Sequence, residues 1–256
     1  MKETTSATVQ SVDRALTILS YLADNGGSGV TEVADALEIH KSTASRLLAT
    51  LASHGFVTQE NGREYRLGVG VVRLAGAVTA DSELIRVARP VCKQLSESVQ
   101  ETVNISILDG DEVINIDQVI GTASVVSVNW VGRRSPLNCT STGKVLLAFA
   151  SADERHRLFR KPLKRCTRHS VLKFEVLEKQ LRDIRSLGYS YTSEELEVGM
   201  NAVAAPIFAF DGEVTAALSI SGPSYRMTDT RIPDLGEAAQ QAAREISAGL
   251  GFQPTR

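Results

Sequence analysis

The stretch 31–55, TEVADALEIHKSTASRLLATLASHG, constrains the fold of this 256-residue chain more than any other part of it. Its second half spaces apolar residues at i, i+3, i+4 and i+7, which forms one stripe along a helix: Ala44, Leu47, Leu48 and Leu51. A shorter helix ends near Leu37, with Thr31 as its expected N-cap, and residues 38–40 make a tight turn between the two. The spacing therefore predicts a helix-turn-helix.

The side of the second helix that faces away from the stripe is small and polar. At about 100° per residue, Ser42 and Arg46 point away from the stripe and Thr43 lies on its flank. Short hydroxyls approach phosphates and base edges closely, and Arg46 has the reach to bind a guanine edge or a phosphate. The predicted DNA contacts of this helix are Lys41, Ser42, Thr43, Ser45 and Arg46. The alternative is an ordinary amphipathic helix whose polar side is only solvated.

A hairpin signal follows this helix directly. Asn61-Gly62 stands between two short β-prone runs, 56–58 and 64–67, and this dipeptide favours the tight turn of a β-hairpin. A helix-turn-helix followed by a hairpin is a winged helix, which favours DNA binding over the solvated alternative. Arg63 and Arg66 of the wing are therefore expected near the DNA backbone or the minor groove.

The segments on either side of the winged helix are predicted to be helical. A first helix over 9–23 is indicated by apolar residues expected to pack on the stripe: Val12, Ala15, Leu16, Leu19 and Leu22. Arg14 on this helix has the reach to bind a phosphate, and a plain surface arginine is the alternative. A helical connector follows the wing. A second helix is expected to begin near Asp81 and to be kinked at Pro90.

The remainder of the chain alternates strand and helix signals. Two hairpins are expected, 103–108 with 112–120 and the strongly apolar 200–210 with 213–221, plus a third strand at 124–131. Helices are expected at 142–150, 153–159, 175–186 and 235–250. Hairpins interrupted by helices, without strict β-α-β units, predict an α+β fold in which helices cover a mostly antiparallel sheet.

Composition excludes several classes of protein. The net charge of −2 argues against a generic polyanion binder or a structural DNA-packaging protein, although the wing and second helix concentrate cations that a dimer doubles. No apolar run reaches the roughly 18 residues of a membrane span, and the first ten residues lack the apolar core of a signal peptide. The expected location is the cytoplasm, with no membrane partner.

The cysteines do not indicate a metal or a cofactor. Cys92, Cys139 and Cys166 are odd in number and widely spaced, with neither C-x-x-C nor a nearby histidine pair. They are expected to be buried or idle thiols, and no cofactor is expected.

The sequence resembles the IclR family of bacterial transcriptional regulators over nearly its whole length. The resemblance rests on SVDRALTIL, KSTASRLLATL, SPLNCTSTGKVLLAF, EELEVGMNAVAAPIF and AALSISGP, in the order and at the spacing of the family. It implies a winged helix-turn-helix (1–70), a linker helix (71–82) and a C-terminal GAF-like α/β effector-binding domain (83–256). It also implies a dimer or dimer of dimers that binds double-stranded operator DNA, controls a catabolic operon and responds to a small organic acid.

The resemblance also implies the wall of an effector pocket. The residues carried over are Ser141, Thr142, Gly143, Thr192, Met200, Ala202, Ser219 and Ser221. Two physical arguments agree with it: Ser219 and Ser221 share one face of a strand, and the amides of 141–143 open a helix that suits a carboxylate. The alternative is that these are only an N-cap and small core residues. Some relatives place an acid or a cysteine where Thr192 and Ala202 align, which leaves the identity of the effector open.

An enzymatic alternative rests on Ser141-Thr142-Gly143-Lys144, which matches the S-x-x-K of serine acyl hydrolases. The pattern is weak, because residues 170–173 match it as well and neither S-D-N nor K-T-G is present. A phosphate loop lacks its earlier glycine and the hydroxyl residue after the lysine. The chain is therefore expected not to be an enzyme.

Overall fold

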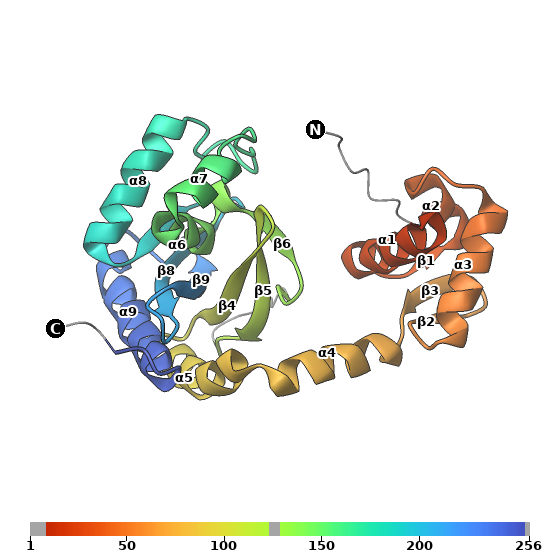
Figure 1. Cartoon of the computed structure of the whole chain (residues 1–256), viewed down its shortest axis with the longest axis horizontal. Coiled ribbons are helices and arrows are strands. Elements are labelled where there is room, and N and C mark those ends of the chain that lie inside the picture. Colours follow the sequence, from red (N-terminus) through yellow and green to blue (C-terminus); the bar gives the residue numbers. More distant parts are fainter. Residues whose placement is uncertain (1–8, 123–128, 254–256) are drawn as a thin grey trace. The chain divides into compact units, whose positions relative to one another are not determined.

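The computed structural model describes residues 9–122 and 129–253, with the backbone alone for 78–81. The chain forms two compact units, Met1–Asp81 and Ser82–Arg256 (Figure 1). Among the described residues no helix has the length and apolar character that crossing a bilayer requires.

The first unit is a winged helix-turn-helix, as predicted. Its elements are α1 (Gln10–Asn25), β1 (Ser28–Gly29), α2 (Val30–Ala36), α3 (Lys41–Ser53), β2 (Val57–Glu60), β3 (Glu64–Leu67) and α4 (Val69–Asp81). The three strands form an antiparallel sheet in the order β1-β3-β2. At the tip of the wing, Asn61 and Gly62 both adopt positive φ, 50° and 68°, and the Arg63 N–H donates to the Glu60 carbonyl over 3.1 Å. This is the backbone shape that the Asn-Gly pair predicts.

The core of the first unit corrects the predicted inner face of α1. The predicted stripe of α3 is buried at Ala44, Leu48 and Leu51, and α1 covers it with Ile18 and Leu22. Val12 and Leu16 were predicted to pack there, but they are 54% and 60% exposed. Leu16 lies about 160° around the helix from Ile18, so both cannot face the same core.

The start of α2 also differs from the prediction. Thr31 lies inside the helix, which begins at Val30 and is preceded by Gly29. The carboxylate of Glu32 accepts the Gly29 N–H over 2.8 Å and thereby takes over part of the capping role. The N-cap prediction for Thr31 was therefore wrong by two residues.

The second unit is a six-stranded antiparallel sheet covered by helices, as the α+β prediction requires. Its elements are α5 (Glu83–Val99), β4 (Thr102–Asp109), β5 (Glu112–Val119), β6 (Arg134–Pro136), η1 (Leu137–Cys139), α6 (Ser141–Phe149), α7 (Ala152–Leu158), α8 (Phe174–Leu187), β7 (Ser190–Ser193), β8 (Met200–Phe208), β9 (Val214–Pro223) and α9 (Ile232–Gly249). The strand order is β6-β5-β4-β9-β8-β7. Both predicted hairpins, β4–β5 and β8–β9, are confirmed, and β9 is central.

The two faces of this sheet differ in character. Val103 and Ile105 of β4, with their neighbours on β8 and β9, lie in a core with α5 and α9. On the other face α6 and α8 form a second core with Ala204 and Ala217 (Figure 1). Because strand residues alternate, Asn104 falls on the α6 face, between two residues of the α5 and α9 core. The α6 side of the sheet therefore carries a buried polar side chain as well as alanines.

Three predicted details of this unit have different outcomes. Residues 124–128 of the predicted third strand lie outside the described residues; Trp130 is not in a strand, and Val131 makes one isolated bridge with Asn115. The sheet edge beside β5 is formed by β6 instead. The predicted restart near Asp81 is confirmed, because the Ser82 hydroxyl accepts the Ile85 N–H over 3.3 Å, and α5 then continues through Pro90 as one helix.

A partly buried ion pair joins the residue before β4 to the segment after β9. Glu101 is 1% exposed, and Arg226 donates to both of its carboxylate oxygens from Nε and a terminal nitrogen, each over 2.8 Å. A Cβ on Gly222 would lie 2.3 Å from one of these oxygens. The carboxylate therefore occupies the space that a side chain at position 222 would need.

Candidate functional site

The outer side of α3 is open to solvent. Lys41, Ser42, Ser45 and Arg46 are exposed and Thr43 is half-buried, in agreement with the predicted orientation of the helix. Within the described part of the chain, neither Lys41 nor Arg46 forms an ion pair. The face therefore presents two cations and three hydroxyls that are available to a partner.

The first turn of α3 lacks the usual stabilising groups. His40 precedes the helix in an extended conformation without a side-chain cap, and the first turn holds no acidic residue. Lys41 instead places a positive charge at the positive end of the helix dipole, which costs about 0.3–1 kcal/mol. An approaching phosphate would reverse both deficits, because helix N-termini bind anions through their free amides.

The predicted arginines outside α3 differ in availability. Arg66 of the wing is held by Glu60 over 2.9 Å and by Glu64 over 3.6 Å. Arg63, at the end of the turn, is exposed and makes no ion pair with any described residue. Arg14 is half-buried on α1. Of the two wing arginines, Arg63 is therefore the one free to meet a phosphate.

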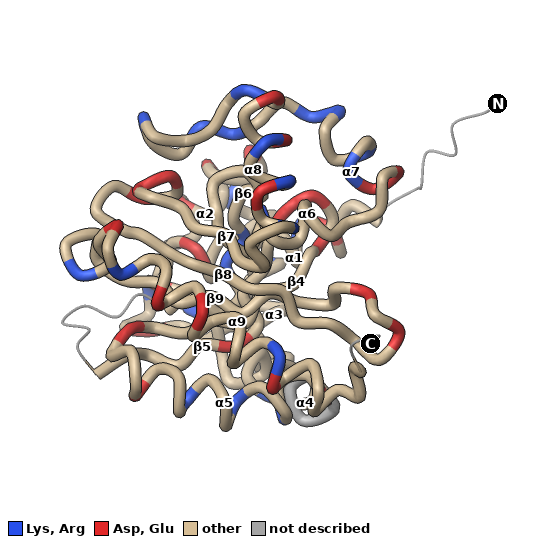
Figure 2. The backbone as a smooth tube through the Cα atoms, turned by 90° about the vertical axis from the view of Figure 1, so that its left-hand side faces the viewer, with Lys and Arg blue, Asp and Glu red and all other residues tan. Residues whose placement is uncertain are grey.

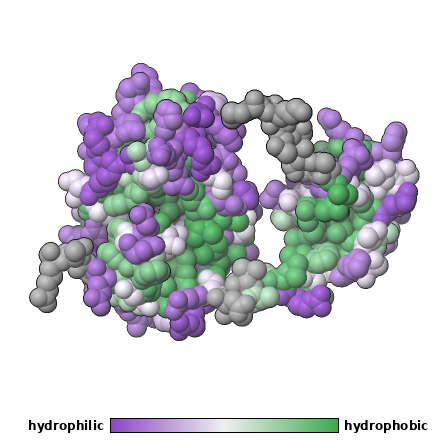
Figure 3. Space-filling model, viewed as in Figure 1, coloured by the Kyte–Doolittle hydropathy of each residue, from purple (hydrophilic) through white to green (hydrophobic). Residues whose placement is uncertain are grey.

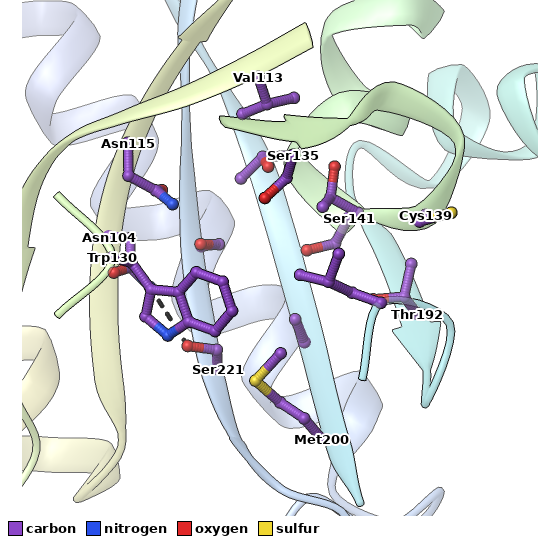
Figure 4. Close-up of a pocket in the computed structure, with 15 residues that line it drawn as sticks. Asn104, Val113, Asn115, Trp130, Ser135, Cys139, Ser141, Thr192, Met200 and Ser221 are labelled. Atoms are coloured by element: carbon purple, nitrogen blue, oxygen red, sulfur yellow. Dashed lines mark hydrogen bonds between the residues drawn. The ribbon is translucent and has the colours of Figure 1, made fainter. Parts of the chain in front are cut away.

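The second unit contains a small cavity between the sheet and the start of α6. Its volume is about 50 Å³, and the predicted residues that line it are Ser141, Thr142, Thr192, Met200, Ala202, Ser219 and Ser221 (Figure 4). No charged side chain lines it within the described residues. The two strands of its floor, β8 and β9, carry no charged residue either and are tan in Figure 2. The cavity is therefore polar but uncharged.

Strand register explains why these residues meet. Ser221 pairs with Ala202, which in turn pairs with Thr192, so one cross-strand row spans three strands. Ser219 lies two residues before Ser221, on the same face, and pairs with Asn104. The Asn104 amide donates to the Ser221 hydroxyl over 3.2 Å, while its carbonyl oxygen has no partner among the described groups.

The start of α6 supplies the other wall and corrects the role predicted for Gly143. The Thr140 hydroxyl caps the helix by accepting the Gly143 N–H over 3.1 Å, so that amide is already used. Gly143 does not line the cavity; a Cβ there would lie 2.3 Å from the Leu137 carbonyl oxygen. It permits close packing of α6, and of the first three amides of this helix those of Ser141 and Thr142 form no hydrogen bond with a described group.

Sequence reasoning missed several residues of the cavity wall. They are Asn104, Val113, Asn115, Trp130, Ser135, Cys139, Thr140 and Leu196. Two signals were present in the sequence: Asn104 interrupts an apolar strand, and Trp130 is the single tryptophan. Cys139 is buried, as the sequence led us to expect of a buried or idle thiol, and in this wall its thiol donates to the Lys164 carbonyl over 3.3 Å.

The geometry does not support the S-x-x-K alternative. The Lys144 ammonium donates to the Glu195 carboxylate over 2.6 Å, and no hydrogen bond joins it to Ser141 among the described residues. Ser141 lines the small cavity, whereas Lys144 does not. The lysine is therefore not placed to activate the serine.

Known proteins resemble this chain over almost its full length. Residues 11–61 match the IclR helix-turn-helix domain, and residues 76–248 match the bacterial transcriptional regulator IclR C-terminal domain. The HTH-type transcriptional regulator BhcR of Paracoccus denitrificans is 36% identical over 247 residues, covering 96% of this chain and 88% of BhcR. The HTH-type transcriptional repressor AllR of Escherichia coli is 34% identical, covering 95% and 91%.

A solved structure extends the likeness to the fold. An IclR homologue from Microbacterium hydrocarbonoxydans, complexed with 4-hydroxybenzoate, has a TM-score of 0.82 and 24% identity, covering 94% of this chain and 98% of the homologue. The two matched domains together span both structural units, from the winged helix to the helix-covered sheet. This chain therefore belongs to the IclR family of bacterial transcriptional regulators.

Proposed function

We propose that this regulator binds an operator through α3 and the wing, and that a small carboxylate in the cavity of the second unit changes its operator affinity. On this proposal Arg46 reads a base edge or grips a central phosphate, while Lys41, Ser42, Thr43 and Ser45 hold the flanking backbone. Arg63, and more weakly Arg14, contact phosphates alone. The unpaired state of Lys41, Arg46 and Arg63 supports this assignment.

The size of the cavity supports a small effector. A volume of about 50 Å³ holds about three to five water-sized groups, since each water needs roughly 10–15 Å³ by the same measure. An aliphatic acid of two or three carbons fits this space. A ring such as the 4-hydroxybenzoate bound by the Microbacterium homologue would need the walls to move apart.

The polar groups of the cavity support a carboxylate, and this is the observation that carries the proposal. The free Ser141 and Thr142 amides point from the positive end of α6, and hydroxyls of Ser219 and Ser221 lie across the floor. Since no cation lines the described part of the wall, the protein would bind the anion through dipoles, while the apolar strands exclude water.

We propose further that the chain acts as a two-fold dimer or dimer of dimers on an inverted-repeat operator. One slightly acidic chain offers few cations, and a second copy doubles them. Apolar side chains left exposed on the first unit support contact with another copy (Figure 3): Val12, Leu16, Val69, Val72 and Leu74. The regulated genes are expected to encode catabolism of the effector.

The test starts by selecting operator DNA from a random duplex pool with the full chain. Fluorescence anisotropy then measures operator affinity with acetate, glycolate, pyruvate, lactate or 4-hydroxybenzoate added. A coupling of about 1–3 kcal/mol changes the affinity about 5- to 150-fold, and one of the small acids is expected to do so. Replacing both Ser219 and Ser221 by alanine should abolish the response while effector-free binding stays intact.

The control is Ser224→Ala, a serine just after β9 that does not line the cavity. It should keep the full response. A selected pool without an inverted repeat would contradict the dimer. The effector assignment is refuted if none of these carboxylates releases or absorbs heat when titrated into the full chain in a calorimeter and none changes the operator affinity.

A further inference from the structure

The stretch 155–173, here called the basic segment, concentrates positive charge on the second unit. It holds eight of the 28 lysines and arginines, two of the four histidines and none of the 30 aspartates and glutamates. It runs from within α7 to the residue before α8. The eight cations are Arg155, Arg157, Arg160, Lys161, Lys164, Arg165, Arg168 and Lys173. Because the whole chain is slightly acidic, this charge is a local feature.

The backbone of the basic segment is held in place, although residues 159–173 form neither helix nor strand. The Asn138 amide donates to the carbonyls of Lys164 and Val171 over 2.8 and 3.0 Å, and its oxygen accepts the Lys164 N–H over 3.1 Å. The buried Ser170 hydroxyl accepts the N–H groups of residues 166 and 167 over 3.0 and 2.9 Å. The apolar side chains of the segment pack in the core with α6 and α8: Leu158, Phe159, Leu163 and Val171. The cations therefore stand on an ordered scaffold.

Most of these cations are open to solvent, and half of them are unpaired. Seven are exposed, and Arg155 is half-buried. Two form ion pairs with acidic residues outside the segment, and two donate hydrogen bonds, one to a backbone carbonyl and one to a histidine. The side chains of the other four form no ion pair or hydrogen bond with any described residue: Arg160, Lys164, Arg165 and Lys173.

The chemistry of this surface favours a nucleic acid over a protein partner. No large apolar side chain is exposed in the basic segment, all of which the structure describes, and this end of the second unit is mostly hydrophilic (Figure 3). Protein interfaces are centred on apolar and aromatic anchors and are depleted of lysine, whereas a phosphate backbone is bound by lysine and arginine alone. The same chain carries a helix-turn-helix domain, so duplex DNA is the polyanion that it already engages.

From this arrangement we propose that the basic segment binds the phosphate backbone of duplex DNA beside the operator. Phosphate contacts carry no sequence information, so the segment adds affinity without adding specificity. Because the winged helix holds the DNA, the second contact forms at a high effective concentration. Operator affinity should therefore depend on the length of the flanking duplex and on salt. The inference requires DNA binding by the chain, but neither the effector nor the bases that α3 reads.

Salt titrations of the full chain on two duplexes test this contact by fluorescence anisotropy. One duplex is the selected operator trimmed to its footprint, and the other has about 30 further base pairs at each end, roughly 100 Å of duplex. Lys164→Gln combined with Arg165→Gln removes two unpaired charges, so on the long duplex the slope of log affinity against log salt should fall by about two for each chain that contacts the flank. Arg160→Gln alone should lower it by about one. Both variants should match the wild type on the trimmed duplex.

The matched control combines Lys93→Gln with Arg244→Gln. These are also one lysine and one arginine, exposed and without an ion pair to any described residue, but they lie on α5 and α9, which cover the other face of the sheet. The control should keep the wild-type slope on both duplexes. Both double variants should also melt as the wild type does, because none of the four side chains is bonded within the described part of the chain.

The inference is wrong if the segment variants and the control have the same slope on the long duplex, a result that would leave the segment to an acidic protein or to solvent. It is also wrong if the slope changes equally on the trimmed duplex, because flanking DNA would then play no part. If Arg46→Ala weakens operator binding while the segment variants match the control, the proposed function stands without this contact. If the length-dependent loss appears but neither Arg46→Ala nor any carboxylate has an effect, the contact stands and the proposed function fails.

Discussion

The N-termini of helices α3 and α6 both take part in the proposed sites, but their surroundings treat the free amides differently. α3 begins at Lys41 in open solvent, with no side-chain cap and an unpaired cation in its first turn. α6 begins at the buried Ser141, where Thr140 caps Gly143 and the nearby cation, Lys144, is paired with Glu195.

The difference follows from access to water. Solvent satisfies the free amides of α3, so the chain can leave them uncapped until a phosphate displaces the water. The amides of α6 are buried, and each one left unbonded costs free energy, so the fold satisfies Gly143 internally and leaves only two amides open. On the proposed function, the buried end of α6 therefore offers an anion fewer free amides than the exposed end of α3 does.

The largest expected effect comes from removing the buried cation. Lys144→Met leaves Glu195 buried without its partner, which should lower the free energy of unfolding of the second unit by about 3–5 kcal/mol. Calorimetric melting of the full chain measures this. Lys161→Met, which breaks an exposed pair with Asp111, should change the same transition far less because solvent screens that pair. If the two variants lose the same free energy of unfolding, burial does not determine the cost of breaking an ion pair.

The second effect concerns operator binding. Arg46→Ala should lose about 1–3 kcal/mol of operator affinity and relax specificity at one base pair, because the residue is exposed, unpaired and central on α3. Anisotropy titrations against the selected operator and its single-base variants measure both. Arg66→Ala is the control, since Glu60 and Glu64 already hold that arginine. If Arg66→Ala loses more operator affinity than Arg46→Ala does, the proposed orientation of α3 in the DNA groove is wrong.

The third effect concerns the buried cap. Thr140→Val keeps the shape of the side chain but removes a hydroxyl that accepts the Gly143 N–H and donates to the Pro136 carbonyl over 3.2 Å, which should cost about 0.5–2 kcal/mol of stability. Denaturant titration of the full chain measures the loss. The counterpart on α3, His40→Val, removes no cap bond and should leave stability nearly unchanged. If both substitutions cost the same, capping does not distinguish the two helix starts.

The smallest effect has opposite signs in two measurements. Lys41→Met removes a charge that opposes the dipole of α3, so the first unit should gain about 0.3–1 kcal/mol of stability. The same change should lower the salt dependence of operator binding by about one phosphate contact. Thermal melting and a salt series of anisotropy titrations check the two parts. A loss of stability would show that Lys41 has a structural partner in solution.

Much of the fold could be predicted because its signals are local. The stripe of α3, the Asn61-Gly62 turn and the β8–β9 hairpin each lie within a short stretch whose period or turn chemistry fixes the structure. The inner face of α1 could not be predicted as easily, since its apolar residues surround more than half of the helix and only packing selects Ile18. Strands β6 and β7 have three and four residues, too few for a period to show.

The resemblance predicts seven residues of the cavity wall beside α6, but it does not predict the rest of the wall. Ser219 and Ser221 follow from strand alternation within one segment. Asn104 joins them only through pairing across the sheet, 117 residues away from Ser221, and no local pattern reveals that distance. The pairing of Lys144 with Glu195 spans 51 residues and was likewise invisible.

The ion pair between Glu101 and Arg226 limits how this sequence can change over evolutionary time. Glu101 fills the space beside Gly222, so a larger residue at 222 is compatible with the fold only after the glutamate has been replaced. Replacing the glutamate alone leaves Arg226 without the acceptors of its Nε and terminal nitrogen donors. Single substitutions at these three positions should therefore be rare in a library of functional variants. Replacements should arrive together, as a covarying triplet that joins the first strand of the sheet to the segment after β9.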